Sequence, residues 1–196
     1  MSEIESVPIN QENLWRLDTP GAEGWERTAR VEDPRKYFMV STDCHANEPP
    51  DLWATRLPEK YRERAPRIIT DEKGVQWRYC EGYRPDRVRV MSFEGEDWVR
   101  SKAGADPAQR LEDNKRDGID VEIIFPNKGL AMWATPDPVF ANAQCRVWND
   151  WAWEQFGAYR DAMVPVASIA TGDLEGAMAE IERCARIGYR VLSFPC

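Results

Sequence analysis

The order of elements along the chain predicts an α/β protein whose main sheet has about four parallel strands. Short runs of apolar and β-branched residues alternate with longer segments whose apolar residues recur every three or four positions. Aspartates precede these longer segments and glycines follow two of them, a pattern typical of helix ends. Alternation of strand and helix favours parallel strands joined by crossover helices.

The first third of the chain contains one strand of this sheet and one segment of a different kind. Residues 37–42 (YFMVST) are mostly apolar and β-branched, which predicts a buried strand. A turn-forming segment comes next at residues 43–51, and residues 52–53 and 58–64 predict two short helical turns. Residues 66–100 alternate in polarity and contain two glycine turns, so a small antiparallel hairpin or meander is expected there.

The remaining strands and helices alternate to the end of the chain. Asp106 with Pro107 begins a helix that ends at Gly118, and Asp173 begins another that ends at Gly188. A third helix is expected from residue 138 to about residue 159. The strands between and after these helices are expected over residues 119–125, 164–169 and 189–194.

Composition excludes several classes of protein. The net charge of −8 makes nucleic acid and anionic membranes poor partners, and no run of about 20 apolar residues predicts a membrane span. Five cysteines without a CxxC pair indicate a reducing compartment, so a cytoplasmic location is expected. Residues 1–36 are polar and rich in proline and glycine, and they are interpreted as an N-terminal arm or tail.

Several spaced motifs resemble one family of enzymes. The segment DCHANEPPDLW, with LPEKYRERAPR after it, is similar to the opening of the amidohydrolase-related proteins. The segments RLEDNKRDGIDVEIIFPNKGL, VWNDWAWEQF and VPVASIATGDLEGAMAEIERCARIGYRVLSFP resemble later parts of the sequences of that family, in the same order. The family consists of metal-dependent hydrolases and decarboxylases built on a (β/α)8 TIM barrel.

The resemblance implies that residues 37–196 form the N-terminal half of such a barrel, with residues 66–100 as a β insertion. Insertions of this kind lie on loops at the carboxyl ends of the strands, where substrate binds. The activity implied is hydrolysis of a C–N or C–O bond, or decarboxylation of a small carboxylic acid, with a small molecule as substrate.

The resemblance also implies a metal site at Asp43 and His45. Residues i and i+2 of an extended chain point to the same side, so both side chains can face one centre while Cys44 faces away. Carboxylate and imidazole suit a divalent ion such as zinc or manganese. The alternative is that Asp43 and His45 only hydrogen-bond each other or cap a turn. Asn127, just past the second strand, is a candidate substrate contact.

Other polar residues receive simpler interpretations. Glu48 is interpreted as a loop acid in a turn, and the charged residues between 110 and 122 as a solvated helix face. His45 is the only histidine in the chain, so the family's further histidine ligands are missing. The 196 residues are therefore expected to be an incomplete and inactive fragment that binds metal weakly.

A second hypothesis gives the chain no catalytic role. A half-barrel would have two unpaired edges, at the apolar strands of residues 37–42 and 189–194, and open apolar edges promote association. A homo-oligomer is therefore expected. The chain could then be a non-catalytic half-barrel that acts by self-association or as a subunit of a larger complex.

Overall fold

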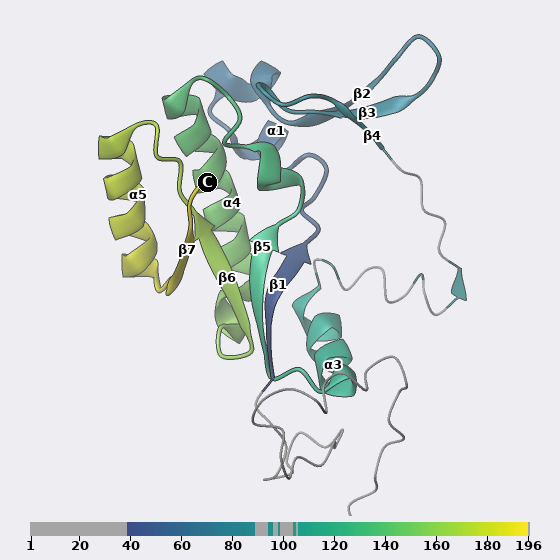
Figure 1. Cartoon of the computed structure of the whole chain (residues 1–196), viewed down its shortest axis with the longest axis vertical. Helices are drawn as coiled ribbons and strands as arrows, with labels where there is room; N and C mark the ends of the chain where they lie inside the picture. The colour runs from purple at the N-terminus through teal and green to yellow at the C-terminus, as the bar shows by residue number, and fades with distance from the viewer. Residues whose placement is uncertain (1–38, 89–93, 96–97, 99–103, 105, 196) are drawn as a thin grey trace, which may run out of the picture.

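The main sheet contains four parallel strands in the order β1-β5-β6-β7 (Figure 1). The structure, a computed structural model, describes residues 39–88, 94–95, 98, 104 and 106–195. The strands are β1 (Val40–Ala46), β5 (Val121–Pro126), β6 (Met163–Ser168) and β7 (Val191–Ser193). The predicted parallel sheet with intervening helices is confirmed.

The first strand extends further than the sequence indicated. It was expected to end at residue 42, but β1 continues to Ala46 because Cys44, His45 and Ala46 pair with residues 124–126 of β5. The pairing register shifts between Ser41 and Cys44, as at a β-bulge. Asp43 and His45 therefore belong to the strand itself. The preceding residues 37–38 lie outside the described part of the chain.

Each of the three long helices begins at an aspartate cap. The helices are α3 (Pro107–Asp117), α4 (Pro138–Phe156) and α5 (Leu174–Ile187). The side chains of Asp106, Asp137 and Asp173 accept hydrogen bonds from backbone N–H groups of the first turn. Gly118 and Gly188 end α3 and α5 with φ of 73° and 115°, which glycine adopts without strain.

A second, antiparallel sheet comes after β1 in sequence. It contains β2 (Arg67–Thr70), β3 (Gln76–Tyr79) and β4 (Asp86–Arg87), and it confirms the small antiparallel sheet that was expected. Between β1 and β2 lie α1 (Leu52–Arg56) and the 3-10 helix η2 (Glu59–Arg64). The proposed boundaries of the arm, the barrel segment and the insertion stay predictions. The whole arm falls within residues 1–38, and part of the insertion falls on residues 89–93, 96–97 and 99–100, all outside the described residues.

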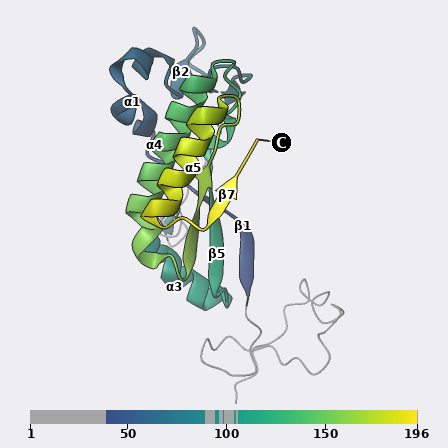
Figure 2. The ribbon, with the colours of Figure 1, turned by 90° about the vertical axis from the view of Figure 1, so that its left-hand side faces the viewer.

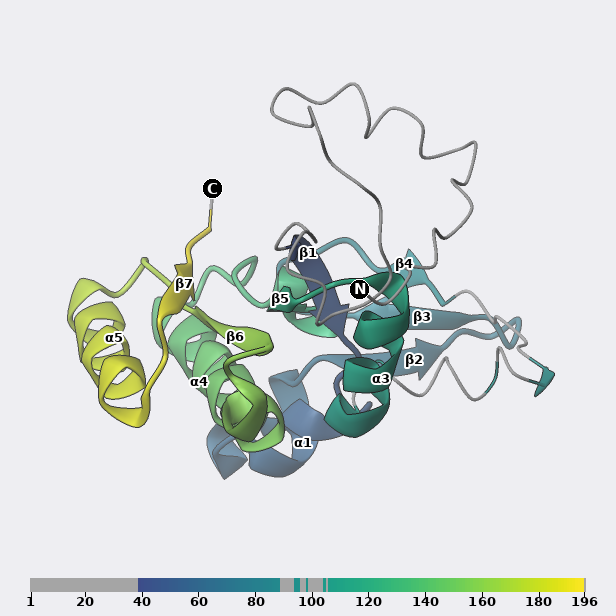
Figure 3. The same cartoon turned by 90° about the horizontal axis from the view of Figure 1, so that it is seen from below.

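Helices α4 and α5 lie on the same face of the main sheet (Figure 2). In β5, Glu122, Ile124 and Pro126 are buried, while the alternate residues are only half-buried. Ile124 lies in the core cluster of buried residues to which α4 contributes Phe140, Trp148 and Trp151. Figure 3 shows the strands in order from β7 to β1 along one side of these helices.

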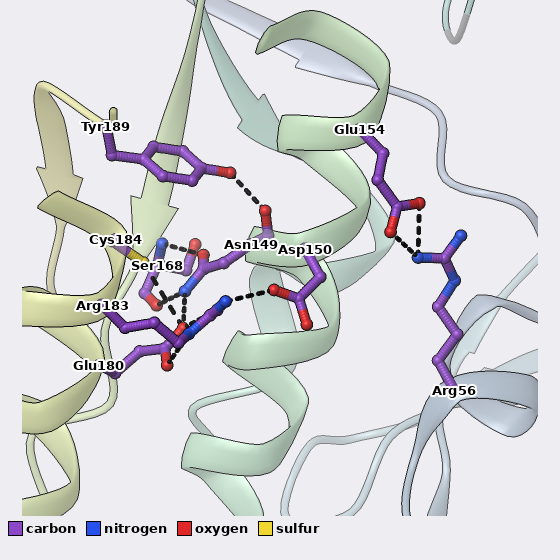
Figure 4. Close-up of polar contacts among 9 residues, drawn as sticks. All are labelled: Arg56, Asn149, Asp150, Glu154, Ser168, Glu180, Arg183, Cys184 and Tyr189. Atoms are coloured by element: carbon purple, nitrogen blue, oxygen red, sulfur yellow. Dashed lines mark hydrogen bonds and ion pairs between the residues drawn. The ribbon is translucent and has the colours of Figure 1, made fainter. Parts of the chain in front are cut away.

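A buried polar network joins α4, α5 and β6 (Figure 4). Asn149 is fully buried, and its amide group bonds both the N–H and the C=O of Ser168 as well as the carboxylate of Glu180. Arg183 of α5 in turn bonds Glu180 and Asp150. Because these bonds join residues of different elements, the network fixes α5 against α4 and the sheet.

None of the described helices combines the length and the apolar character needed to cross a membrane.

Candidate metal site and neighbouring cavity

His45 is held in a fixed orientation at the carboxyl end of β1. Its Nδ1 lies 2.7 Å from the carbonyl oxygen of Pro126, the last residue of β5. A carbonyl oxygen only accepts, so Nδ1 carries the proton and donates it. In the neutral ring, Nε2 then presents a lone pair, which is the form in which a histidine binds a metal ion.

Asp43 lies beside the second nitrogen of this ring. Its Oδ1 is 3.2 Å from His45 Nε2, and the Asp43 side chain is 84% exposed against 35% for His45. The two side chains thus share one side of β1, as the alternation predicted. The contact fits both interpretations: two metal ligands next to each other, or a hydrogen-bonded pair in which Nε2 also carries a proton.

Cys44 faces a different environment. Its Sγ lies 2.9 Å from Ser41 Oγ, and burial raises the pKa of the thiol above its ordinary value. A thiol with a raised pKa stays protonated near neutral pH and is a poor nucleophile or ligand.

A buried ion pair contacts the backbone of His45. Arg110 of α3 bonds Glu122 of β5 at 2.6 Å, with only 11% and 6% of the two side chains exposed. The same guanidinium donates to the carbonyl oxygen of His45 at 3.1 Å. The expectation that the charged residues of 110–122 form a solvated helix face is therefore wrong for Arg110 and Glu122. Their pairing joins α3 to β5, a contact between elements that a helix pattern does not predict.

Glu48 connects the loop after β1 to the loop after β5. Its carboxylate is almost completely buried and accepts hydrogen bonds from the backbone N–H groups of Asn127, Lys128 and Gly129, at 2.9–3.0 Å. These residues begin the 3-10 helix η4 (Lys128–Ala131). The interpretation of Glu48 as a plain turn residue missed this role. No pattern in the sequence indicates it, because the partners lie about 80 positions away.

Asn127 lies where the sequence indicated, at the carboxyl end of β5. Its Nδ2 donates to Asn47 Oδ1 at 2.6 Å, which brings two amide side chains from neighbouring loops together. Lys128, the next residue, donates from Nζ to the carbonyl oxygen of Glu48. Lys128 was not considered a site residue from the sequence.

A cavity of about 570 Å³ opens beside these residues. Its walls come from the loops after β1 and β5 and from the antiparallel sheet, and they include Asn47 and Asn127. Asp43 and His45 are not among the lining residues. The carboxyl end of the main sheet therefore carries the Asp43–His45 pair and, next to it, a cavity of the size that takes small molecules.

The residues described here provide only part of a metal site. Carboxylate and imidazole suit a divalent ion, and the Nδ1 hydrogen bond leaves Nε2 available for it. Within the described ranges, however, no group of three or more His, Cys, Asp and Glu side chains is placed to hold a metal. A catalytic zinc usually has three protein ligands, so Asp43 and His45 could contribute to such a site but do not complete it.

Comparison with known proteins identifies the fold. No family model matches the sequence, and no curated protein matches it either. Among solved structures, the chain is similar to an amidohydrolase from Mycobacterium avium subsp. paratuberculosis K-10, with a TM-score of 0.65 and 15% identity over 81% of this chain. That match covers 49% of the amidohydrolase, so the chain spans about half of its length.

Two further matches are to 2,6-dihydroxybenzoate decarboxylase. The enzyme from Rhizobium gives a TM-score of 0.43 and 19% identity, over 78% of this chain and 36% of the enzyme. The structure of a complex with 2,6-dihydroxybenzoate gives 0.43 and 21%, over 78% and 37%. The TM-score of 0.65 shows the fold alone: four parallel strands with intervening helices, in the strand–helix order of a partial TIM barrel.

Proposed function

We propose that this chain carries the first-strand metal ligands of a metal-dependent enzyme of the amidohydrolase-related family. The observation that carries the proposal is the orientation of His45, whose Nδ1 is fixed by Pro126 while Nε2 lies beside Asp43 at the carboxyl end of β1. The amidohydrolase-like fold and the resemblance of the sequence motifs support the family. In barrels of this kind, catalytic groups lie at the carboxyl ends of the strands.

The reaction proposed is hydrolysis of a C–N or C–O bond, or decarboxylation of a small carboxylic acid. A divalent ion of the zinc or manganese kind, when bound, lowers the pKa of a water ligand and polarises a carbonyl group. Asp43 and His45 would hold the ion from the β1 side. Asn47 and Asn127 would donate hydrogen bonds to the substrate. Glu48 would hold the two loops that carry them together.

The test is calorimetric titration of the 196-residue chain with zinc and manganese. Two ligands should give weak binding, which His45→Ala and Asp43→Asn each remove. Cys44→Ser is the control, because its thiol is held by Ser41 and should leave the titration unchanged. Metal binding that His45→Ala does not alter would show that His45 and Asp43 are not the metal ligands. Submicromolar binding that His45→Ala abolishes would show a complete site, which the described residues do not provide.

The alternative is a non-catalytic half-barrel that acts through association. The observation in its favour is that, among the described strands, β1 pairs only with β5 and β7 only with β6. A panel of hydrolase and decarboxylase substrates separates the two hypotheses. Turnover that His45→Ala removes supports the enzyme.

A further inference from the structure

The cavity beside the Asp43–His45 pair is lined by more basic than acidic side chains. Among the lining residues that the structure describes, the charged ones are Arg67, Arg78, Lys128 and Asp86, three cations against one acid. The whole chain has 34 acids against 26 bases and a net charge of −8. Positive charge is therefore concentrated in this cavity against the overall balance of the chain, which is the arrangement that attracts an anionic ligand.

Lys128 is positioned for such a ligand by the contacts of its own loop. Its Nζ donates to the Glu48 carbonyl oxygen, and an ammonium group has three donors, so others stay available for a ligand. The Glu48 carboxylate is already bonded by three backbone N–H groups. The pKa of Lys128 is lowered, mainly by burial; Arg78 also lowers it, while Glu48 and Asp51 raise it. The two cations thus repel each other, and an anion between them would relieve that repulsion.

Arg78, on β3, lines the same cavity. It forms an ion pair with Asp86 at 3.4 Å, with 43% and 54% of the two side chains exposed. A pair this long and this exposed is weak, so a ligand can compete for the guanidinium. Arg67 differs, because its guanidinium donates to the carbonyl oxygens of Glu63 and Ala65.

The other residues that line the cavity indicate which further groups the ligand should contain. Aromatic and aliphatic side chains make up much of the lining: Trp53, Ile68, Tyr79, Tyr83 and Leu130. The volume of about 570 Å³ lies within the range of small-molecule sites. An apolar body with one anionic group matches this combination of apolar walls and two cations.

We propose that this cavity binds an organic anion, an aromatic carboxylate in the simplest case, between Lys128 and Arg78. The antiparallel sheet contributes Arg78 and Tyr79, and η4 contributes Lys128. Asn47 and Asn127, the substrate contacts of the function proposed above, line the same cavity, whereas Asp43 and His45 do not. Binding of the anion is expected without metal, so it can be tested apart from the metal titration.

The experiment is calorimetric titration of the 196-residue chain, in buffer with a chelator, with benzoate, benzamide and acetate. Benzamide has the ring without the charge, and acetate has the charge without the ring. Benzoate should bind, more weakly as salt is raised, and each of the other two should bind about tenfold more weakly or not at all. Benzamide or acetate binding as tightly as benzoate would overturn the proposal, and so would no binding of benzoate.

The variants Lys128→Gln and Arg78→Gln locate the site. Each should weaken benzoate binding about tenfold, because each removes a charged hydrogen-bond donor and keeps part of the aliphatic stem. Lys73→Gln, an exposed lysine in the turn between β2 and β3, is the matched control and should leave benzoate affinity unchanged. An equal loss in the control would refute the site. If Lys128→Gln fails to fold, Arg78→Gln alone decides: unchanged affinity in that variant overturns the proposal.

Discussion

Glu48 has the largest role among the single residues that the sequence did not identify. The NEPP segment is typical of a turn, and that pattern predicts only local backbone structure. In the fold, the Glu48 carboxylate is 1% exposed and accepts three backbone hydrogen bonds from the start of η4. A buried carboxylate is stable only when it is bonded in this way. Glu48 therefore fixes the loop that carries Asn127 and Lys128.

Replacing Glu48 by glutamine should destabilise the chain by about 2 kcal/mol in the free energy of unfolding. The amide keeps one acceptor oxygen but turns an NH2 group toward backbone N–H groups, so at least one buried donor loses its partner. Urea unfolding at neutral pH measures the change. Glu72→Gln, at an exposed turn position, should change stability by less than about 0.5 kcal/mol. Similar losses in both variants would contradict the role of Glu48.

At the scale of elements, Arg64 joins three segments that lie far apart in the sequence: η2, the turn at Glu81 and the start of α4. Arg64 lies at the end of η2 and bonds Glu81 at 2.6 Å and Asp137, the cap of α4, at 2.8 Å. Its guanidinium also stacks over Phe140, 4.2 Å from the ring centroid. The hydrogen bonds from Arg64 are the main cause that lowers the pKa values of Glu81 and Asp137.

These lowered pKa values predict an acid-sensitive contribution to stability. Both carboxylates have folded pKa values below their ordinary values of 4.5 and 3.8, so the stabilisation is complete above the ordinary values. It is lost as the pH falls from there through the lowered folded values, where both groups take up protons. Urea unfolding between about pH 7 and pH 3 should show stability declining at the acid end of this range.

The variant Arg64→Met tests the cause of this pH dependence. It keeps the aliphatic stem over Phe140 but removes the donors, so its stability should fall less between about pH 5 and pH 3 than that of the unmodified chain. Arg84→Met, an exposed arginine before β4, should keep the original pH profile. An unchanged profile in Arg64→Met would show that other groups cause the acid dependence.

The main sheet of the molecule has two outer strands. In the described part of the chain, β1 and β7 each pair with one neighbour only. Val40 of β1, Leu192 of β7 and Phe194 just beyond it are exposed apolar residues. Unpaired strand edges with exposed apolar side chains bind other strands readily.

The purified 196-residue chain is therefore expected to self-associate. Its mass by light scattering should rise with concentration, and Val40→Lys combined with Leu192→Lys should shift it toward the monomer, because lysine on an edge strand opposes pairing. Leu174→Lys, at a 73% exposed position on α5, adds positive charge away from the sheet and should not change the mass. A monomer at all concentrations would contradict this expectation.

The features that could be predicted from the sequence are those that depend on neighbouring residues. Each of the aspartate caps bonds N–H groups within three positions, and both terminal glycines act on their own helix, so composition and spacing were enough to place α3, α4 and α5. The contact of Asp43 with His45 is also local, because alternate residues of a strand share one side.

The contacts that join distant segments exist only in the folded chain. The pairing of β1 with β5 sets which residues of the two strands lie side by side, and a strand pattern does not encode that register. That register brings His45 to Pro126 and Glu48 to the start of η4, in each case about 80 positions away. Arg78 and Lys128 likewise line one cavity only because of where the antiparallel sheet packs. The cavity and its positive charge could not be predicted from the sequence, because residues from three separate segments form them.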